Sequence, residues 1–87
     1  MLLSDMTSEM IQVEKSLLYE LIEFKIRSMN EEIQSVLERW HYQSSNSFIN
    51  DARNGVIKNA EMDAILLRQL VYDRDELQNK KAQFQES

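Results

Sequence analysis

The chain has 87 residues, with one glycine, no proline and no cysteine, and its 15 acidic and 10 basic residues give a formal net charge of −5. This length predicts a single domain, 1–87, and the scarcity of turn-forming residues favours a few long helices over a strand-rich fold. The lack of cysteine excludes disulfides and thiolate metal sites, and the acidic balance counts against a protein that binds nucleic acid alone.

The chain begins MLLSDMTSEM, which lacks the positive region and apolar run of a secretory signal. No apolar stretch approaches the roughly 20 residues that span a membrane, so we expect a cytoplasmic protein without a membrane segment. Residues 1–7 are expected to fray, and a first helix is predicted over about residues 8–41. This helix would be about 50 Å long, which exceeds the roughly 25–30 Å diameter of a compact chain of this size.

An apolar seam dominates the first helix. Its members recur at alternating spacings of three and four residues: Tyr19, Ile22, Ile26, Met29, Ile33, Val36 and Trp40. This spacing is typical of a helix that packs lengthwise against other helices.

A second apolar stripe lies away from the seam in the first half of this helix, at Met10, Leu17, Leu21 and Phe24, and it ends at Ser28. A helix with two apolar faces has to pack on two sides. Folding of the first residues back over the stripe would cover little area, so we expect a second chain to cover this half. The predicted interface residues are Met10, Leu17, Tyr19, Leu21, Ile22, Phe24 and Ile26.

A short helix is expected over about residues 45–54, with Ser44 or Ser45 as its N-cap and Gly55 in the left-handed position that follows its end. Its Phe48 is predicted to meet Trp40 at the end of the first helix.

Asn59 is the predicted N-cap of a last helix over about residues 60–84. The first half of this helix is apolar nearly all round, which predicts a central, largely buried segment. Its second half is mostly polar and is expected to be a solvated extension, with residues 85–87 frayed.

These elements predict an all-α fold: two long antiparallel helices joined by a short helix, a helical hairpin. Because the first half of the first helix is left without enough cover from its own chain, we expect a homodimer with a four-helix-type core.

Candidate chemical sites are few. Glu38 and His41 have the Glu-x-x-His spacing of di-iron bundles, but Trp40 in the seam places both toward solvent. Glu20 and Glu23 have a magnesium-chelating spacing that nothing matches on the last helix. Solvated helix faces explain these side chains more simply, so we predict no catalytic residue, no metal and no cofactor.

Charged and aromatic residues of the second half also have simple structural explanations. Four basic residues, Arg68, Arg74, Lys80 and Lys81, alternate with acids, which indicates ion pairs on a wet surface rather than a nucleic-acid strip. Trp40 is expected in the core, and Tyr42 is the better candidate for a surface anchor.

The leading functional hypothesis is a non-enzymatic protein–protein interaction module that self-associates, binds a partner protein of unknown identity, or does both. In size and composition the chain is similar to antitoxin subunits that neutralise a toxin partner. A structural coiled-coil or phage-type accessory protein and a DNA-binding regulatory dimer are the alternatives, although residues 44–54 offer only Arg53 as a base for DNA. A metal-dependent enzyme is the weakest hypothesis.

Overall fold

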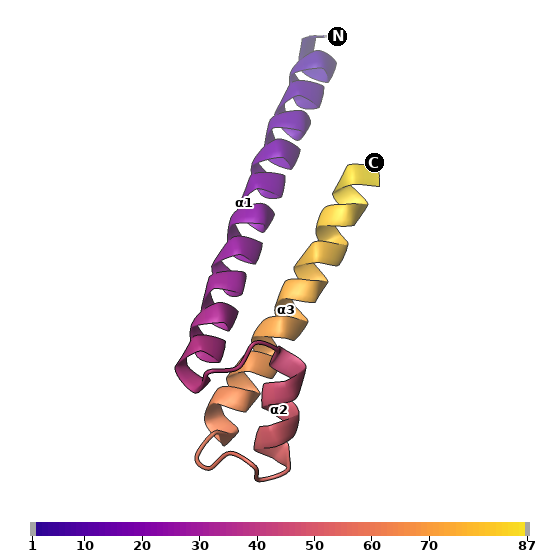
Figure 1. Ribbon diagram of the computed structural model, residues 1–87. Helices are drawn as coiled ribbons and strands as arrows, with labels where there is room; N and C mark the ends of the chain where they lie inside the picture. Colours follow the sequence, from indigo (N-terminus) through magenta and orange to yellow (C-terminus); the bar gives the residue numbers. More distant parts are fainter. Residues whose placement is uncertain (1, 87) are drawn as a thin grey trace.

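The computed structural model describes the backbone of residues 2–86 and the side chains of residues 14–84. Three helices follow one another in this described part of the chain: α1 (Leu2–Trp40), α2 (Ser45–Arg53) and α3 (Glu61–Glu86). The two long helices run antiparallel and pack against each other, and α2 packs beside the start of α3 at the hinge end (Figure 1). The expected all-α hairpin is therefore confirmed, while the dimer stays a prediction.

The hairpin is a rod that measures 66 × 18 × 18 Å. Its radius of gyration of 18.7 Å exceeds the roughly 12 Å of a compact domain of this length. The chain exposes 6983 Å² of surface, where a compact monomer of this mass would expose about 5,400 Å². The elongated rod therefore leaves more surface exposed than a compact chain of this mass would.

Both long helices extend further than expected. α1 begins at Leu2 rather than near residue 8, and α3 continues to Glu86 rather than ending near residue 84. Neither added segment contains the glycine or proline that would oppose a helix. As a result α1 runs past the end of α3 (Figure 1).

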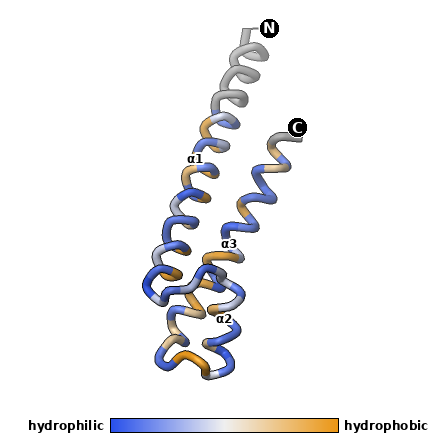
Figure 2. Tube along the Cα trace, viewed as in Figure 1, coloured by the Kyte–Doolittle hydropathy of each residue, from blue (hydrophilic) through white to orange (hydrophobic). Residues whose placement is uncertain are grey.

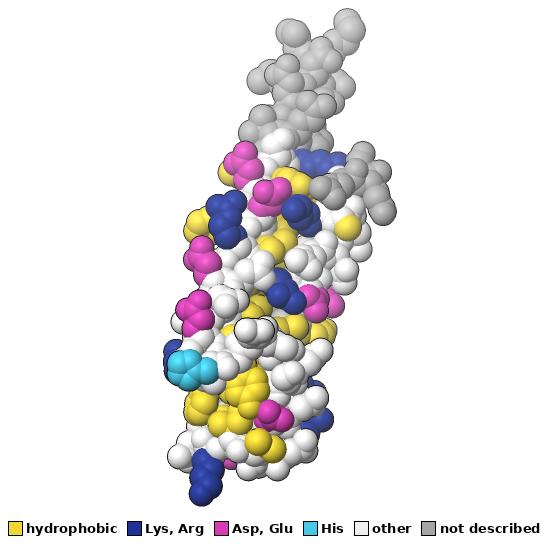
Figure 3. All heavy atoms as spheres, in the orientation of Figure 1, with side chains coloured by type: hydrophobic (Ala, Val, Ile, Leu, Met, Phe, Trp, Pro, Cys, Tyr) yellow, Lys and Arg dark blue, Asp and Glu magenta, His cyan; other side chains and the backbone are white. Residues whose placement is uncertain are grey.

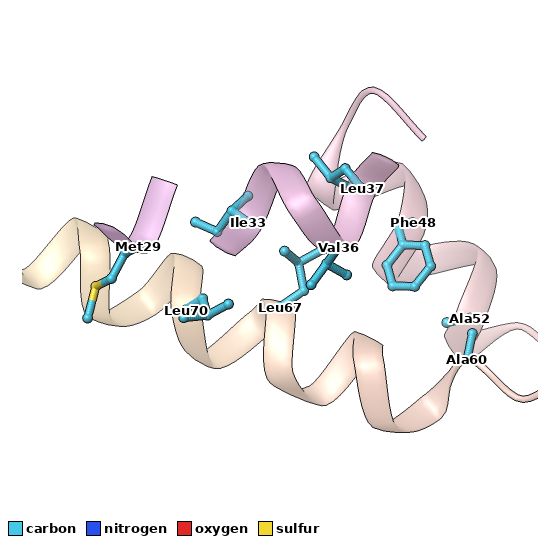
Figure 4. Packing of buried hydrophobic residues seen from close by; sticks show 9 residues of the cluster. All are labelled: Met29, Ile33, Val36, Leu37, Phe48, Ala52, Ala60, Leu67 and Leu70. Carbon is cyan, nitrogen blue, oxygen red and sulfur yellow. The ribbon is translucent and has the colours of Figure 1, made fainter. Parts of the chain in front are cut away.

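The core lies in the hinge half of the rod. Nine buried residues form it: Met29, Ile33, Val36 and Leu37 from α1, Phe48 and Ala52 from α2, Ala60 before α3, and Leu67 and Leu70 from α3 (Figure 4). Ile22 and Ile26 are buried as well. The apolar seam therefore faces the rest of its own chain from Ile22 to Val36, as its spacing predicts, and Trp40 is half-buried at its end.

The first half of α3 is less buried than expected. Four of its large apolar side chains are exposed: Met62, Ile65, Leu66 and Tyr72. The expectation of a largely buried segment is wrong for the single chain, because α1 and α2 cover only one side of α3. Hydrophobic residues recur along both long helices rather than only where the helices meet (Figure 2).

α1 ends in a Schellman motif, the paired hydrogen bonds that close a helix through a left-handed residue. His41 is the left-handed residue of this motif, with φ 60°, and its N–H donates a hydrogen bond to the Glu38 carbonyl at 3.2 Å. The Tyr42 N–H bonds the Leu37 carbonyl at 2.9 Å. The turn into α2 is thus set by backbone bonds without a glycine.

α2 has the caps that its sequence predicts. The Ser44 hydroxyl accepts a bond from the Ser47 N–H at 3.4 Å. Gly55 follows the helix with φ 74°, its N–H bonds the Ala52 carbonyl at 3.3 Å, and the Val56 N–H bonds the Asp51 carbonyl at 2.9 Å. The predicted left-handed glycine is confirmed.

The start of α3 differs from the prediction. Asn59 lies in the left-handed region with φ 61°, and Ala60 is the residue directly before the helix. The Ala60 carbonyl accepts the first helical bond, from the Ala64 N–H at 2.9 Å. Ala60 is fully buried in the core, so packing of its methyl group determines the helix start at the expense of a side-chain cap.

Candidate interaction surface

The predicted interface residues of α1 lie on two different faces. Ile22 and Ile26 are buried, and Tyr19 is half-buried beside α3. The Lys81 ammonium lies 5.7 Å from the centre of the Tyr19 ring and 3.7 Å from a Glu23 carboxylate oxygen. These α1 residues therefore face α3 of their own chain, and the polar second half of α3 lies along α1 rather than standing alone in solvent.

Leu17, Leu21 and Phe24, which we name the outer stripe, lie on another face of α1. Their exposed fractions are 55%, 56% and 65%. Leu17 precedes Ile22 by five residues, so at about 100° per residue the two side chains are about 140° apart. In the space-filling view, hydrophobic side chains also show at the edge of α1 away from α3 (Figure 3).

Met10, the remaining predicted interface residue, has the helical spacing of the outer stripe. Its backbone belongs to α1, but its side chain lies outside the described residues. The outer stripe as the structure describes it therefore consists of three side chains.

A second apolar surface is present on α3, in Met62, Ile65, Leu66 and Tyr72. Beside it an apolar groove of about 200 Å³ runs between α2 and α3, lined by Ile49, Ala52, Ala64 and Ile65 with Arg53, Glu61 and Arg68. The sequence did not single out this surface, since apolar residues on every side of a helix do not show which side is covered.

A polar contact joins the end of α1 to the start of α3. Asp63 accepts hydrogen bonds from the indole Nε1 of Trp40 at 2.7 Å and from Arg39 at 2.8 Å. The Trp40 bond, together with the hydrogen bond and charge of Arg39, holds the pKa of Asp63 below its ordinary value, against the opposing effect of partial burial. This contact fixes the hinge and leaves Asp63 ionised at neutral pH.

Tyr42 is part of the hinge packing rather than a free anchor. Its hydroxyl donates a 2.6 Å hydrogen bond to Asp51, and its ring meets Phe48 edge-on with 5.4 Å between the centroids. The hydrogen bond to Asp51, with some burial and the nearby negative charge, raises the pKa of Tyr42. Trp40 lies on Phe48 at 5.7 Å, so the predicted meeting of these two rings is confirmed.

The acidic candidates do not converge on one site. Glu38 and His41 are exposed. Over the part of the chain that the structure describes, no three histidine or acidic side chains lie close enough to hold a metal ion. On α3, Asp73 accepts a bond from Gln69 at 2.9 Å, and Asp75 pairs with Arg74 at 3.2 Å.

Two of the four basic residues on α3, Arg74 and Lys81, contact α1. Arg74 donates to the Asn30 side chain of α1 at 3.1 Å, and Lys81 contacts Tyr19 and Glu23 of α1. Arg68 and Lys80 are exposed. The four bases therefore do not form one continuous surface for a phosphate backbone.

Between residues 2 and 86, none of the helices has the length and apolar character needed to cross a membrane. Comparison of the chain with protein-family models, with curated proteins and with solved structures found no match in any of the three. The candidate site is therefore argued from the structure alone, from the exposed side chains of the outer stripe.

Proposed function

We propose that the protein is a non-enzymatic interaction module that binds through the outer stripe of α1, first of all to a second copy of itself. One observation carries the proposal: Leu17, Leu21 and Phe24 are each more than half exposed on a helix whose opposite face is already buried. Monomeric proteins seldom leave large apolar side chains clustered in water without an interaction purpose.

Burial of the outer stripe would offset part of the free-energy cost of self-association. Burying the exposed half of each side chain would contribute about 1 kcal/mol, since full burial of a leucine or phenylalanine contributes about 1.5–3 kcal/mol. A two-fold dimer buries the stripe of both copies, so the gain is about 6 kcal/mol. The gain of about 6 kcal/mol is comparable with the roughly 4–15 kcal/mol that association costs, so a stable dimer needs contacts beside the outer stripe as well.

The exposed surface on α3 favours a second candidate function, binding of another protein at the hinge end. Met62, Ile65, Leu66 and Tyr72 are separate from the outer stripe, so one copy can pair through α1 while α3 remains accessible. An antitoxin-like subunit would use such a surface for its toxin partner.

The mass in solution tests the proposal. We expect light scattering coupled to gel filtration to give twice 10.3 kDa for the wild type. Phe24→Asp should give a monomer with unchanged helicity by circular dichroism. Ile65→Asp is the matched control, because Ile65 is 66% exposed and Phe24 is 65% exposed. A dimer that survives Phe24→Asp but not Ile65→Asp would move the interface to α3, and a monomeric wild type would refute self-association.

A further inference from the structure

The outer stripe has charged neighbours with a regular placement. If Leu21 is given heptad position a, then Leu17 and Phe24 both take position d. Glu20 and Arg27 then occupy position g on one flank, and Lys25 and Glu32 occupy position e on the other, with Glu32 one turn beyond Ser28, where the apolar stripe ends. These flanking positions decide which helix, in which direction, pairs with a coiled-coil seam.

These four flanking charges are available for a partner. All four side chains are exposed. Within the described part of the chain none of them takes part in a salt bridge or a side-chain hydrogen bond. By contrast, Glu23, which contacts α3, is paired with Lys81. The four flanking charges are thus unpaired, whereas Glu23 and Lys81 pair across the two long helices.

We propose that two copies of the chain pair in parallel through α1, with the outer stripes in register. This inference rests on the proposed function and specifies its geometry. In a parallel pair, position g of one helix lies beside position e five residues later on the other. Glu20 then faces Lys25 of the second copy, and Arg27 faces Glu32 of the second copy. The two-fold axis repeats both contacts, so all four meetings join opposite charges.

The antiparallel arrangement fits less well. There position g faces position g of the other helix, and e faces e. When the two-fold axis passes between Leu21 and Phe24, Glu20 of each copy lies beside Arg27 of the other copy, which gives two attractive pairs. On the other flank Lys25 meets the apolar Leu18, so two attractive pairs are formed instead of four. The parallel arrangement therefore uses every flanking charge.

Two charge-reversed variants test the direction. One variant carries Glu20→Lys and Arg27→Glu, which reverses both g positions. The other carries Lys25→Glu and Glu32→Lys, which reverses both e positions. Each variant keeps the net charge of −5 and the apolar stripe. The parallel geometry makes all four contacts repulsive in each variant alone and attractive when the two variants are mixed.

The expected result is that each variant alone associates about a hundredfold more weakly than the wild type, since the attraction of each exposed pair is lost and replaced by repulsion of similar size at four sites. An equimolar mixture should recover the wild-type association, as sedimentation equilibrium or light scattering over a dilution series would measure. Circular dichroism of each variant should match the wild type.

The other outcomes overturn the parallel geometry. In an antiparallel pair the variant with reversed g positions would still self-associate, because its two reversed charges would again meet with opposite signs, and mixing the two variants would not strengthen association. Unchanged association of both variants would show that the flanking charges do not contact each other. If Phe24→Asp still gives monomers in that case, the outer stripe remains the interface and only the parallel geometry fails.

Discussion

Replacing Phe48 by alanine should remove most of the stability of the hinge. Phe48 is fully buried, and its ring meets Trp40 at 5.7 Å and Tyr42 at 5.4 Å. The nine-residue core draws on all three helices, and Phe48 is the large side chain by which α2 enters it (Figure 4). Its loss would detach α2 from the hinge and leave a cavity between α1 and α3.

The magnitude follows from the burial. A fully buried phenylalanine replaced by alanine costs about 3–5 kcal/mol, the transfer free energy together with the cavity. A core of this size supplies about 3–5 kcal/mol in all. The two ranges match, so Phe48→Ala should leave a single chain with a free energy of unfolding near zero at 25 °C. Phe48→Leu keeps most of the volume and should lose about 1–1.5 kcal/mol with the ring contacts.

Urea unfolding followed by circular dichroism and by the fluorescence of Trp40, the only tryptophan, measures both losses. The protein concentration is held constant, because association would raise the apparent stability. A loss of less than about 1 kcal/mol for Phe48→Ala would refute the reasoning, since it would mean that α2 contributes little to the core in solution.

Three further predictions concern pH and the backbone. Because the folded pKa of Asp63 is lowered, the contribution of Asp63 to the free energy of unfolding is complete above its ordinary pKa of about 3.9 and is lost as the pH falls below that value. Urea midpoints measured between pH 6 and 2 should therefore fall less for Asp63→Asn than for the wild type. Because the folded pKa of Tyr42 is raised, the contribution of Tyr42 to the free energy of unfolding is complete below its ordinary pKa of about 10 and is lost as the pH rises above that value. Tyr42→Phe should weaken this alkaline loss of stability, and an unchanged dependence of the urea midpoint on pH would contradict the Asp51 contact. At Gly55 no atom lies within 4 Å of an added Cβ, so Gly55→Ala should lower the free energy of unfolding only by the backbone strain of φ 74°, about 1 kcal/mol. Gly55→Asn should lower it less, because asparagine adopts the left-handed region more readily. Equal thermal midpoints for the two variants would argue against that strain.

Features encoded by neighbouring residues could be predicted from the sequence. The spacing of the seam indicates which residues of α1 are buried, from Ile22 to Val36. The short-range signals at Ser44 and Gly55 mark both ends of α2. In each case the determining contacts lie within a few turns of chain.

Features decided by tertiary contacts could not be predicted in this way. A capping side chain at Asn59 is outweighed by the burial of Ala60 in the core. His41 closes α1 in the left-handed region, a place where sequence alone favours glycine. The outer stripe could be found because its spacing of four and three residues is out of phase with that of the seam, whereas on α3 the exposed Ile65 and the buried Leu67 stand in one apolar run.

The one-sided position of the core has a consequence for local opening of the rod. All nine core residues lie in the hinge half, while the open half is held by Ile22, Ile26 and the contacts of Lys81. Amide hydrogen exchange should therefore be slowest around Val36 and faster toward Leu17. The outer stripe lies in this less protected half, so pairing of two copies would slow exchange there most and would couple association to the local order of α1.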